Sequence, residues 1–366
     1  MYNRGSTAIE PRGRIIAVAL VAMVVASSCQ GPYLARLGFE QARFLSRARP
    51  ISELLSAGPD HDRRRSLELV LDARGFALDR GLSPGGAYLA VADTEGLAVA
   101  WVVSAAHRDR LEPYLWRYPL VGAIPYRGYF DRGRADAFAR RLGGRDLDIR
   151  VTEAAGYSTL GWFDDPLPSG LLALDDVALV TVVLHEIVHT TLFVPGHMDF
   201  NESIATALSE RLAVEFFTNR AGPDAVEANR RMALSLARSR FYDRLAGRLR
   251  TLFARAASGD WNGTRTMAER SVVYSDAAAE FEAAGFGDRT SFLAGQPDNA
   301  SFLAAYRYHR GLAELQAWFE RYGGQPGWAG HALGELGEAV ADGQEPYSVL
   351  AGLGRGGVTP PDVSLR

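Results

Sequence analysis

Apolar residues recur at helical spacing along most of this chain and at strand spacing only in its first half. Runs of apolar and β-branched residues predict strands at positions 87–92, 97–103 and 148–153, and the turn residues at 93–96 predict a hairpin between the first two. Helical spacing predicts helices at positions 33–55, 63–75, 132–142, 223–258, 264–285, 299–322 and 330–342. The C-terminal half is therefore expected to be helical.

Two further helices are predicted in the middle of the chain, and the first of them is apolar on almost every side. Asp175 or Asp176 caps its start, and Pro195-Gly196 ends it. A helix without a polar face belongs in a protein core. The second helix, at positions 200–217, carries an apolar stripe that consists of Phe200, Ile204, Ala205, Leu208, Leu212 and Phe216. We expect this stripe to pack against the first helix.

The order of these elements predicts an α+β fold that is mainly helical, with a small N-terminal sheet and a helical C-terminal half. Residues 30–173 would form the α+β part, and residues 174–366 the helical part. No repeat period and no long linker separates the two parts. We therefore expect residues 30–366 to form a single domain.

The composition is that of a globular protein. Apolar residues make up 47% of the chain, and the formal net charge is −3. The apolar content suffices for a large core, whereas the charge balance provides no basic face for a nucleic acid. Nucleic acid is therefore not expected as a partner, and the oligomeric state cannot be read from the sequence.

The first 29 residues have the pattern of an export signal. Arg4, Arg12 and Arg14 give a positive start, an apolar run follows at 15–26, and small residues precede Cys29. The pattern resembles a bacterial lipoprotein signal, in which the cysteine is lipidated and anchors the protein in a membrane. Gln30 then favours the periplasmic face of the outer membrane. Cleavage at another bond, or retention of the segment as an anchor, would be the alternatives.

The apolar central helix contains a motif with metal-binding spacing. His185 and His189 are four residues apart, so they share one helix face and can bind a single ion. Glu186 lies between them. Imidazoles and a carboxylate are costly inside an apolar helix unless something binds them, and a metal ion does so. Metal binding is therefore the favoured interpretation of this motif.

Glu202 is the nearest carboxylate that is well placed to be a third protein ligand. It is expected in the first turn of the second helix, which packs against the first. It also stands three residues after Asp199, where it could form half of a capping box instead. The two roles require the same carboxylate oxygens. His197, in the turn between the two helices, is a more distant ligand candidate and reads more readily as a loop residue.

These residues predict one catalytic zinc ion per chain. His185, His189 and Glu202 would hold the ion and leave a fourth position for water, whose pKa the ion lowers. Glu186 would take the proton of this water and pass it to a leaving amine. The predicted reaction is the hydrolysis of a peptide bond.

The segment HEIVHTTLFVPGHMDFNESIAT resembles the active-site segment of a family of bacterial lipoproteins described as predicted aminopeptidases, and more distantly that of the gluzincin metallopeptidases. Residues 49–51, 126–130, 155–166 and 299–309 also resemble this lipoprotein family, so the likeness covers nearly the whole chain after the signal. The resemblance implies a gluzincin-like fold, a peptide substrate and aminopeptidase activity. The link between the histidine pair and Glu202 is shorter than in aminopeptidase N-type enzymes.

The same resemblance implies further site residues. Gluzincins have a tyrosine or histidine that donates to the developing oxyanion, and Tyr308 is the first candidate here, with His309 the second. By analogy with aminopeptidase N-type enzymes, the segment before the zinc helix would be a strand that pairs with the substrate. This possible substrate strand comprises Tyr157, Ser158, Thr159, Leu160 and Gly161. Glu153 is a candidate for holding the free amine of the substrate.

Two other functions stay open at this point. A zinc endopeptidase of the cell envelope would use the same residues but would need an open groove. A lipoprotein that binds metal or a partner without catalysis would have no use for Glu186.

Overall fold

A computed structural model describes residues 31–94, 100–118, 122–154, 165–259, 261–341 and 343–355. The chain divides into two compact units, Met1–Ala48 and Arg49–Arg366. In the first unit the described part is helix α2 (Gly31–Leu45) with the residues that follow it. The predicted export signal, including Cys29, lies outside the described residues.

The second unit combines short strands with helices, as the α+β prediction requires. One sheet has the strand order β1 (Ala48–Pro50), β2 (Ala90–Ala92) and β8 (Leu167–Pro168). A second has the order β6 (Tyr126–Tyr129), β3 (Ala100–His107) and β7 (Leu147–Ala154), and a third pairs β4 (Trp116–Tyr118) with β5 (Gly122–Ile124). Every described strand ends before residue 169, so the fold is mainly helical with small N-terminal sheets.

The predicted hairpin between 87–92 and 97–103 is wrong. Strand β2 pairs in parallel with β8, with Val91 opposite Leu167, whereas β3 pairs antiparallel with β6 and β7. The two neighbouring strands thus belong to different sheets. Strand β2 ends at Ala92, just before the expected turn residues, but such residues carry no information about which distant strand supplies the hydrogen bonds.

Helices form the rest of the unit. Their bounds are α3 (Ile51–Ser56), α4 (His61–Asp79), α5 (Arg132–Leu142), α6 (Asp176–Thr191), α7 (Met198–Arg220), α8 (Pro223–Ala257), α9 (Gly263–Ala283), α10 (Asn299–Tyr306), α11 (Leu312–Phe319), α12 (Trp328–Val340) and α13 (Pro346–Arg355), with 3₁₀ turns η1 (Ser169–Ala173) and η2 (Phe292–Gly295). None of the described helices is long and apolar enough to cross a membrane.

Two predicted helices are interrupted. The helix expected at 33–55 is split into α2 and α3 by strand β1. The helix expected at 299–322 is split into α10 and α11, because Gly311 adopts a left-handed backbone with φ 64°. Glycine enters this region without a steric penalty and so allows the change of direction. Helix α13 has no counterpart among the predictions.

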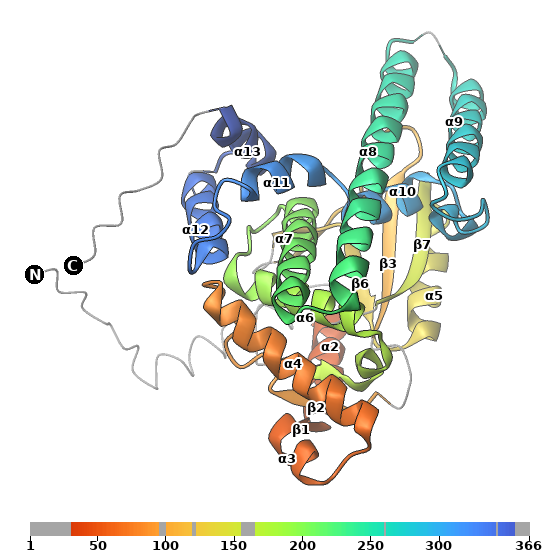
Figure 1. Cartoon of the computed structure of the whole chain (residues 1–366). Helices are drawn as coiled ribbons and strands as arrows, with labels where there is room; N and C mark the ends of the chain where they lie inside the picture. The colour runs from red at the N-terminus through yellow and green to blue at the C-terminus, as the bar shows by residue number, and fades with distance from the viewer. Residues whose placement is uncertain are drawn as a thin grey trace, which may run out of the picture. The chain divides into compact units, whose positions relative to one another are not determined.

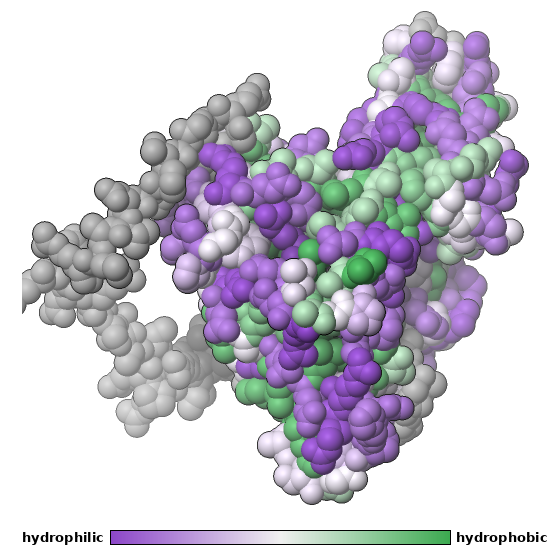
Figure 2. Space-filling model, in the orientation of Figure 1, coloured by the Kyte–Doolittle hydropathy of each residue, from purple (hydrophilic) through white to green (hydrophobic). Residues whose placement is uncertain are grey.

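The core of this unit is built around α6 and α7. Helix α6 packs against α4 and α7, and α7 in turn packs against α8 and α11, so that α6, α7 and α8 lie side by side (Figure 1). The apolar stripe of α7 is buried throughout, as predicted, and α6 buries its apolar residues on several faces. On the face shown in Figure 2, hydrophilic side chains are spread over the surface with hydrophobic ones among them. The apolar central helices are therefore covered by amphipathic ones.

The turn after α4 and helix α12 are in close backbone contact. The amide of Gly330 donates to the carbonyl of Arg80 at 3.0 Å. A Cβ atom on Gly330 would lie 2.2 Å from the carbonyl oxygen of Gly81, closer than any real contact. Because both groups belong to backbone, neither can turn aside. Only glycine fits at position 330.

We predict that Gly330→Ala lowers the free energy of unfolding by about 1–3 kcal/mol, because the helix must move away from Gly81. Gly334 is the matched control on the same helix, since nothing lies within 4 Å of a Cβ placed there. Gly334→Ala should stabilise the protein slightly through helix propensity. Thermal unfolding of both variants measures the difference, and equal Tm values would contradict the packing described.

Candidate metal centre

Helix α6 places two imidazoles on one face, as the four-residue spacing predicted. Its N-cap is Asp175, whose carboxylate accepts a hydrogen bond from the amide of Ala178 at 3.0 Å. His185 and His189 lie one turn apart, with ring centroids 4.9 Å apart and their Nε2 atoms separated by 3.2 Å. The two Nε2 atoms therefore face the same point in space.

Glu202 brings a carboxylate to this point from α7. Its Oε2 lies 3.2 Å from Nε2 of His185 and 3.5 Å from Nε2 of His189. Helix α7 begins at Met198 after the N-cap His197, which makes no side-chain cap bond. Glu202 thus lies beyond the N3 position that a capping box requires. The carboxylate is turned to the histidines, and the capping role does not apply.

The spacing of the three groups suits a single metal ion. Their ligand atoms all lie within 4.8 Å of one another. Ligands about 2.0–2.2 Å from a tetrahedral ion are separated from each other by about 3.3 Å, which is close to the two distances between Glu202 and the histidines. Nitrogen and carboxylate donors are also the ligands that Zn²⁺ accepts. The group can therefore hold a metal ion with little movement.

The electrostatics of the group favour a positive charge between the three side chains. Burial alone would raise the pKa of Glu202, but the two histidines outweigh it and hold that pKa well below its ordinary value. Burial would likewise lower the pKa of His189, yet the negative charges of Glu202 and Glu186 raise it. A cation at this point, whether a proton or a metal ion, compensates the buried carboxylate.

Glu186 lies next to this group on the same helix but is not one of its three members. It is half-buried and follows His185 directly. Its negative charge acts on His189, Tyr308 and Tyr88, and contributes to raising the pKa of each. Its charge is thus part of the electrostatic environment of the three groups.

Tyr308, the first candidate for an oxyanion donor, lies beside the histidine pair. Its ring centroid is 6.2 Å from that of His185. The charge of Glu202 is the main cause that raises the pKa of Tyr308 well above its ordinary value, followed by burial. Because the side chain is still 38% exposed, the carboxylates matter more than burial. The phenol keeps its proton at neutral pH and remains a donor.

A buried arginine fixes the segment that carries Tyr308. The Nε of Arg307 donates to Oδ1 of Asp199 at 3.2 Å, and its guanidinium lies over the ring of Tyr126 at 5.2 Å. The hydroxyl of Ser203 donates to the carbonyl oxygen of Arg307 at 2.9 Å. Ser203 and Asp199 flank Glu202 in α7. Glu202 and Tyr308 are therefore held by one hydrogen-bonded unit.

Asn201 fixes the tight turn between the two helices. Its side chain is fully buried, accepts from the amide of Val194 at 2.9 Å and donates to the carbonyl of the same residue at 2.9 Å. This pair of bonds closes the turn after α6. The position of this turn determines where Glu202, the residue after Asn201, lies relative to the histidines.

The other predicted site residues are not brought into this group. His309 turns to α8, where its ring packs on Tyr242 at 4.9 Å and its Nδ1 lies 2.9 Å from the carbonyl of Ala305. His197 is the half-buried N-cap of α7, and Glu153 is exposed on the edge strand β7. The possible substrate strand, Tyr157, Ser158, Thr159, Leu160 and Gly161, lies outside the described residues.

The roles of several residues near the site were not predicted from the sequence, although Tyr126 and Arg307 lie in segments that resemble the lipoprotein family. Arg307 and Tyr126 are far from the motif along the chain, and only the fold brings them to it. Tyr88 is 2% exposed and has a positive φ of 60°, which is rare for a tyrosine. Burial first, and then the charge of Glu186, raise the pKa of Tyr88 well above its usual value. Asn201, by contrast, adjoins Glu202 in the chain.

Glu210, two turns after Glu202, faces a different helix. It is hydrogen-bonded to Ser235 of α8, and its Oε2 is buried without a partner among the described residues. Burial raises the pKa of Glu210 to about 8. It therefore carries a proton at neutral pH and is not part of the metal-binding group.

One comparison with known proteins gives a match. A family model described as "Putative aminopeptidase" matches residues 32–340, which is most of the chain. No curated protein and no solved structure matches this chain.

We predict that Glu202→Gln weakens binding of a divalent ion by about 100-fold or more, because it removes a ligand charge that no neighbouring residue replaces. Glu210→Gln on the same helix is the control and should bind the ion like the unmodified protein. Zinc titration against a chromophoric chelator gives both affinities. Equal affinities would mean that Glu202 is not a ligand.

We also predict that Glu210 makes stability fall with rising pH. The folded protein holds the Glu210 proton up to about pH 8, whereas the ordinary pKa is 4.5. The stabilisation is therefore complete below pH 4.5 and is lost as pH approaches 8. Relative to the unmodified protein, Glu210→Gln should gain on the order of 3 kcal/mol in unfolding free energy between pH 5 and pH 8. Urea unfolding at both pH values measures this gain, and a pH-independent difference would contradict it.

Proposed function

The chain belongs to the aminopeptidase family whose model it matches, and on this premise we propose that it is a zinc-dependent peptidase that removes residues from the free N-terminus of short peptides. The family supports peptidase activity, and zinc dependence is our extension. The observation that carries the extension is the convergence of His185, His189 and Glu202 within 4.8 Å of one another.

The donor set is that of a catalytic rather than a structural zinc site. Two imidazoles and one carboxylate leave a coordination position open, whereas structural zinc sites are closed by four protein ligands, usually with cysteine. The one cysteine in the chain, Cys29, lies in the N-terminal segment. When bound here, zinc would supply a Lewis acid that polarises a carbonyl and lowers the pKa of a water molecule.

Glu186 is the general base in this proposal. It is half-buried, follows His185 directly in α6, and its negative charge contributes to raising the pKa of both His189 and Tyr308. Glu186 would accept a proton from the attacking water and then donate it to the nitrogen of the leaving amine. Both transfers use one carboxylate, which starts and ends the cycle ionised.

Tyr308 is the proposed donor to the carbonyl oxygen as negative charge develops on it. The raised pKa of Tyr308 supports this role, since a phenol that stays protonated can donate throughout the reaction. The 38% exposure of the side chain leaves it open to a substrate. Its attachment to α7 through Arg307 limits its movement when a peptide binds.

We extend the proposal to location: residues 1–29 direct export, and a lipid on Cys29 anchors the mature protein to a membrane. The support is the positive start, apolar run and cysteine of this segment. The substrates would then be peptides in the cell envelope. A gluzincin-like arrangement, with Glu202 opening the helix that follows the histidine pair, belongs to the same proposal.

We predict that Glu186→Gln keeps its zinc and loses peptide hydrolysis by a factor of about 10² or more, because the amide cannot accept the water's proton. Hydrolysis of a short peptide followed by mass spectrometry, together with zinc analysis, separates the two effects. Glu153→Gln is a suitable control for zinc content, since Glu153 lies on an exposed edge strand.

The same assay distinguishes the aminopeptidase from its alternatives. The zinc-loaded protein should release N-terminal residues from a free peptide and leave the N-acetylated form of the same peptide intact. Cleavage of the acetylated peptide at an internal bond would replace the proposal by an endopeptidase. If neither form is cut, the peptidase proposal fails.

A further inference from the structure

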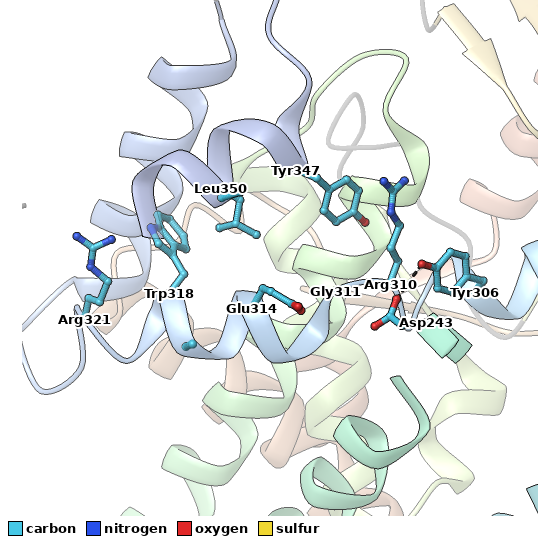
Figure 3. A pocket seen from close by; sticks show the side chains of 11 residues that line it. Asp243, Tyr306, Arg310, Gly311, Glu314, Trp318, Arg321, Tyr347 and Leu350 are labelled. Atoms are coloured by element: carbon cyan, nitrogen blue, oxygen red, sulfur yellow. Dashed lines mark hydrogen bonds between the residues drawn. The ribbon is translucent and has the colours of Figure 1, made fainter. Parts of the chain in front are cut away.

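A cavity of about 580 Å³ opens among the C-terminal helices (Figure 3). Its walls come from α8, α11 and α13 and from the segment that joins α10 to α11. The three metal-binding residues and Tyr308 do not line it. Its volume falls in the range of about 300–1,000 Å³ that is typical of sites for small organic molecules. It is therefore a second place where a ligand can bind.

One end of this cavity carries charged side chains of both signs. Asp243 accepts a hydrogen bond from the hydroxyl of Tyr306 at 2.8 Å, and the carboxylate of Glu314 points toward the same end (Figure 3). The guanidinium of Arg310 lies over the ring of Tyr347 at 3.8 Å. Burial first, and the charge of Glu314 among the further causes, raise the pKa of Asp243. An added ammonium group would relieve this repulsion.

Two of the charged groups at this end lack an ion-pair partner among the described residues. Neither Glu314 nor Arg310 forms a salt bridge with any of the described residues. Stacking on Tyr347 holds the plane of the Arg310 guanidinium while leaving its N–H edges available to a carboxylate. The Glu314 carboxylate and the Arg310 guanidinium are therefore complementary to a molecule that carries one positive and one negative charge.

The other end of the cavity has two apolar side chains in its wall, with the charged Arg321 beside them at the far edge (Figure 3). Trp318 and Leu350 are 2% and 4% exposed, and both lie away from the Arg310 and Asp243 end in Figure 3. An indole and a leucine side chain offer a surface for an aliphatic or aromatic group and no charge. The ligand should therefore have a charged end and an apolar end.

We propose that this cavity binds a free α-amino acid with an apolar side chain. Glu314 and Asp243 would hold its ammonium group, Arg310 its carboxylate, and Trp318 with Leu350 its side chain. This is the class of molecule that an aminopeptidase releases, so the cavity would sense product. Binding itself does not depend on the proposed hydrolysis and is tested without it.

The cavity is connected to the metal centre by two short links. Tyr306 and Arg310, which line it, flank Tyr308 in the chain. The hydroxyl of Tyr347, also in its wall, donates to Oγ of Ser203 at 3.0 Å, and Ser203 follows Glu202 directly. A bound amino acid would therefore contact the same unit that holds Tyr308 and the third ligand.

Calorimetric titration of the zinc-loaded protein tests the proposal, with L-leucine and L-phenylalanine as probes. Each should bind with one site per chain. N-acetyl-L-leucine and L-leucinamide, which lack one of the two charges, should bind about tenfold or more weakly. Glu314→Gln and Arg310→Gln should each weaken leucine binding by a similar factor. Glu338→Gln, on the exposed face of α12, is the matched control and should bind like the unmodified protein.

Zinc content and Tm of each variant show that it is folded, since Glu314 is exposed and outside the core. Two outcomes overturn the proposal. One is the absence of heat with either amino acid at millimolar concentration. The other is leucine binding that Glu314→Gln and Arg310→Gln leave unchanged, which would put the amino acid elsewhere, for example at the metal centre. Binding that meets the expectations would stand even if the protein cuts no peptide.

Discussion

The structure depends on the carboxylate of Glu202 and the imidazole of His189, which are buried between α6 and α7, and on the half-buried imidazole of His185 beside them. These helices form the apolar centre of the unit, where an uncompensated charge would cost several kcal/mol. The histidines and Glu202 are acceptable there because each compensates the other, and their arrangement leaves a point that attracts a cation. The core of the protein and its candidate active site are thus the same pair of helices.

The positions of these groups are set by polar contacts that surround them. Asn201 closes the turn that leads from α6 to Glu202, and Ser203 on its other side binds the backbone of Arg307. The ion pair between Arg307 and Asp199 adds a second bond to the same segment. The positions of Glu202 and Tyr308 are therefore fixed by residues adjacent to Glu202 in the chain and by Arg307, which is distant from it in the sequence. A shift of the Arg307 segment would move Tyr308 and Glu202 together.

Local features of the fold could be predicted from the sequence, and distant ones could not. Asp175 and the apolar pattern defined the start and the burial of α6, because a cap acts within one turn of the chain. The helix ends at Thr191, a turn before the Pro195-Gly196 that was expected to end it. The spacing of His185 and His189 likewise fixed their common face. The prediction of strand partners failed, because β2 pairs with β8, some 75 residues away along the chain. Arg307 and the break at Gly311 were missed for the same reason, because their importance depends on tertiary contacts.

The most direct test of the account is anomalous X-ray diffraction at the zinc edge from crystals of the zinc-loaded protein. The account predicts one strong peak per chain, about 2.0–2.2 Å from Nε2 of His185, from Nε2 of His189 and from the carboxylate of Glu202. A peak held by other residues, or a zinc site from which Glu202 has turned away, would contradict it.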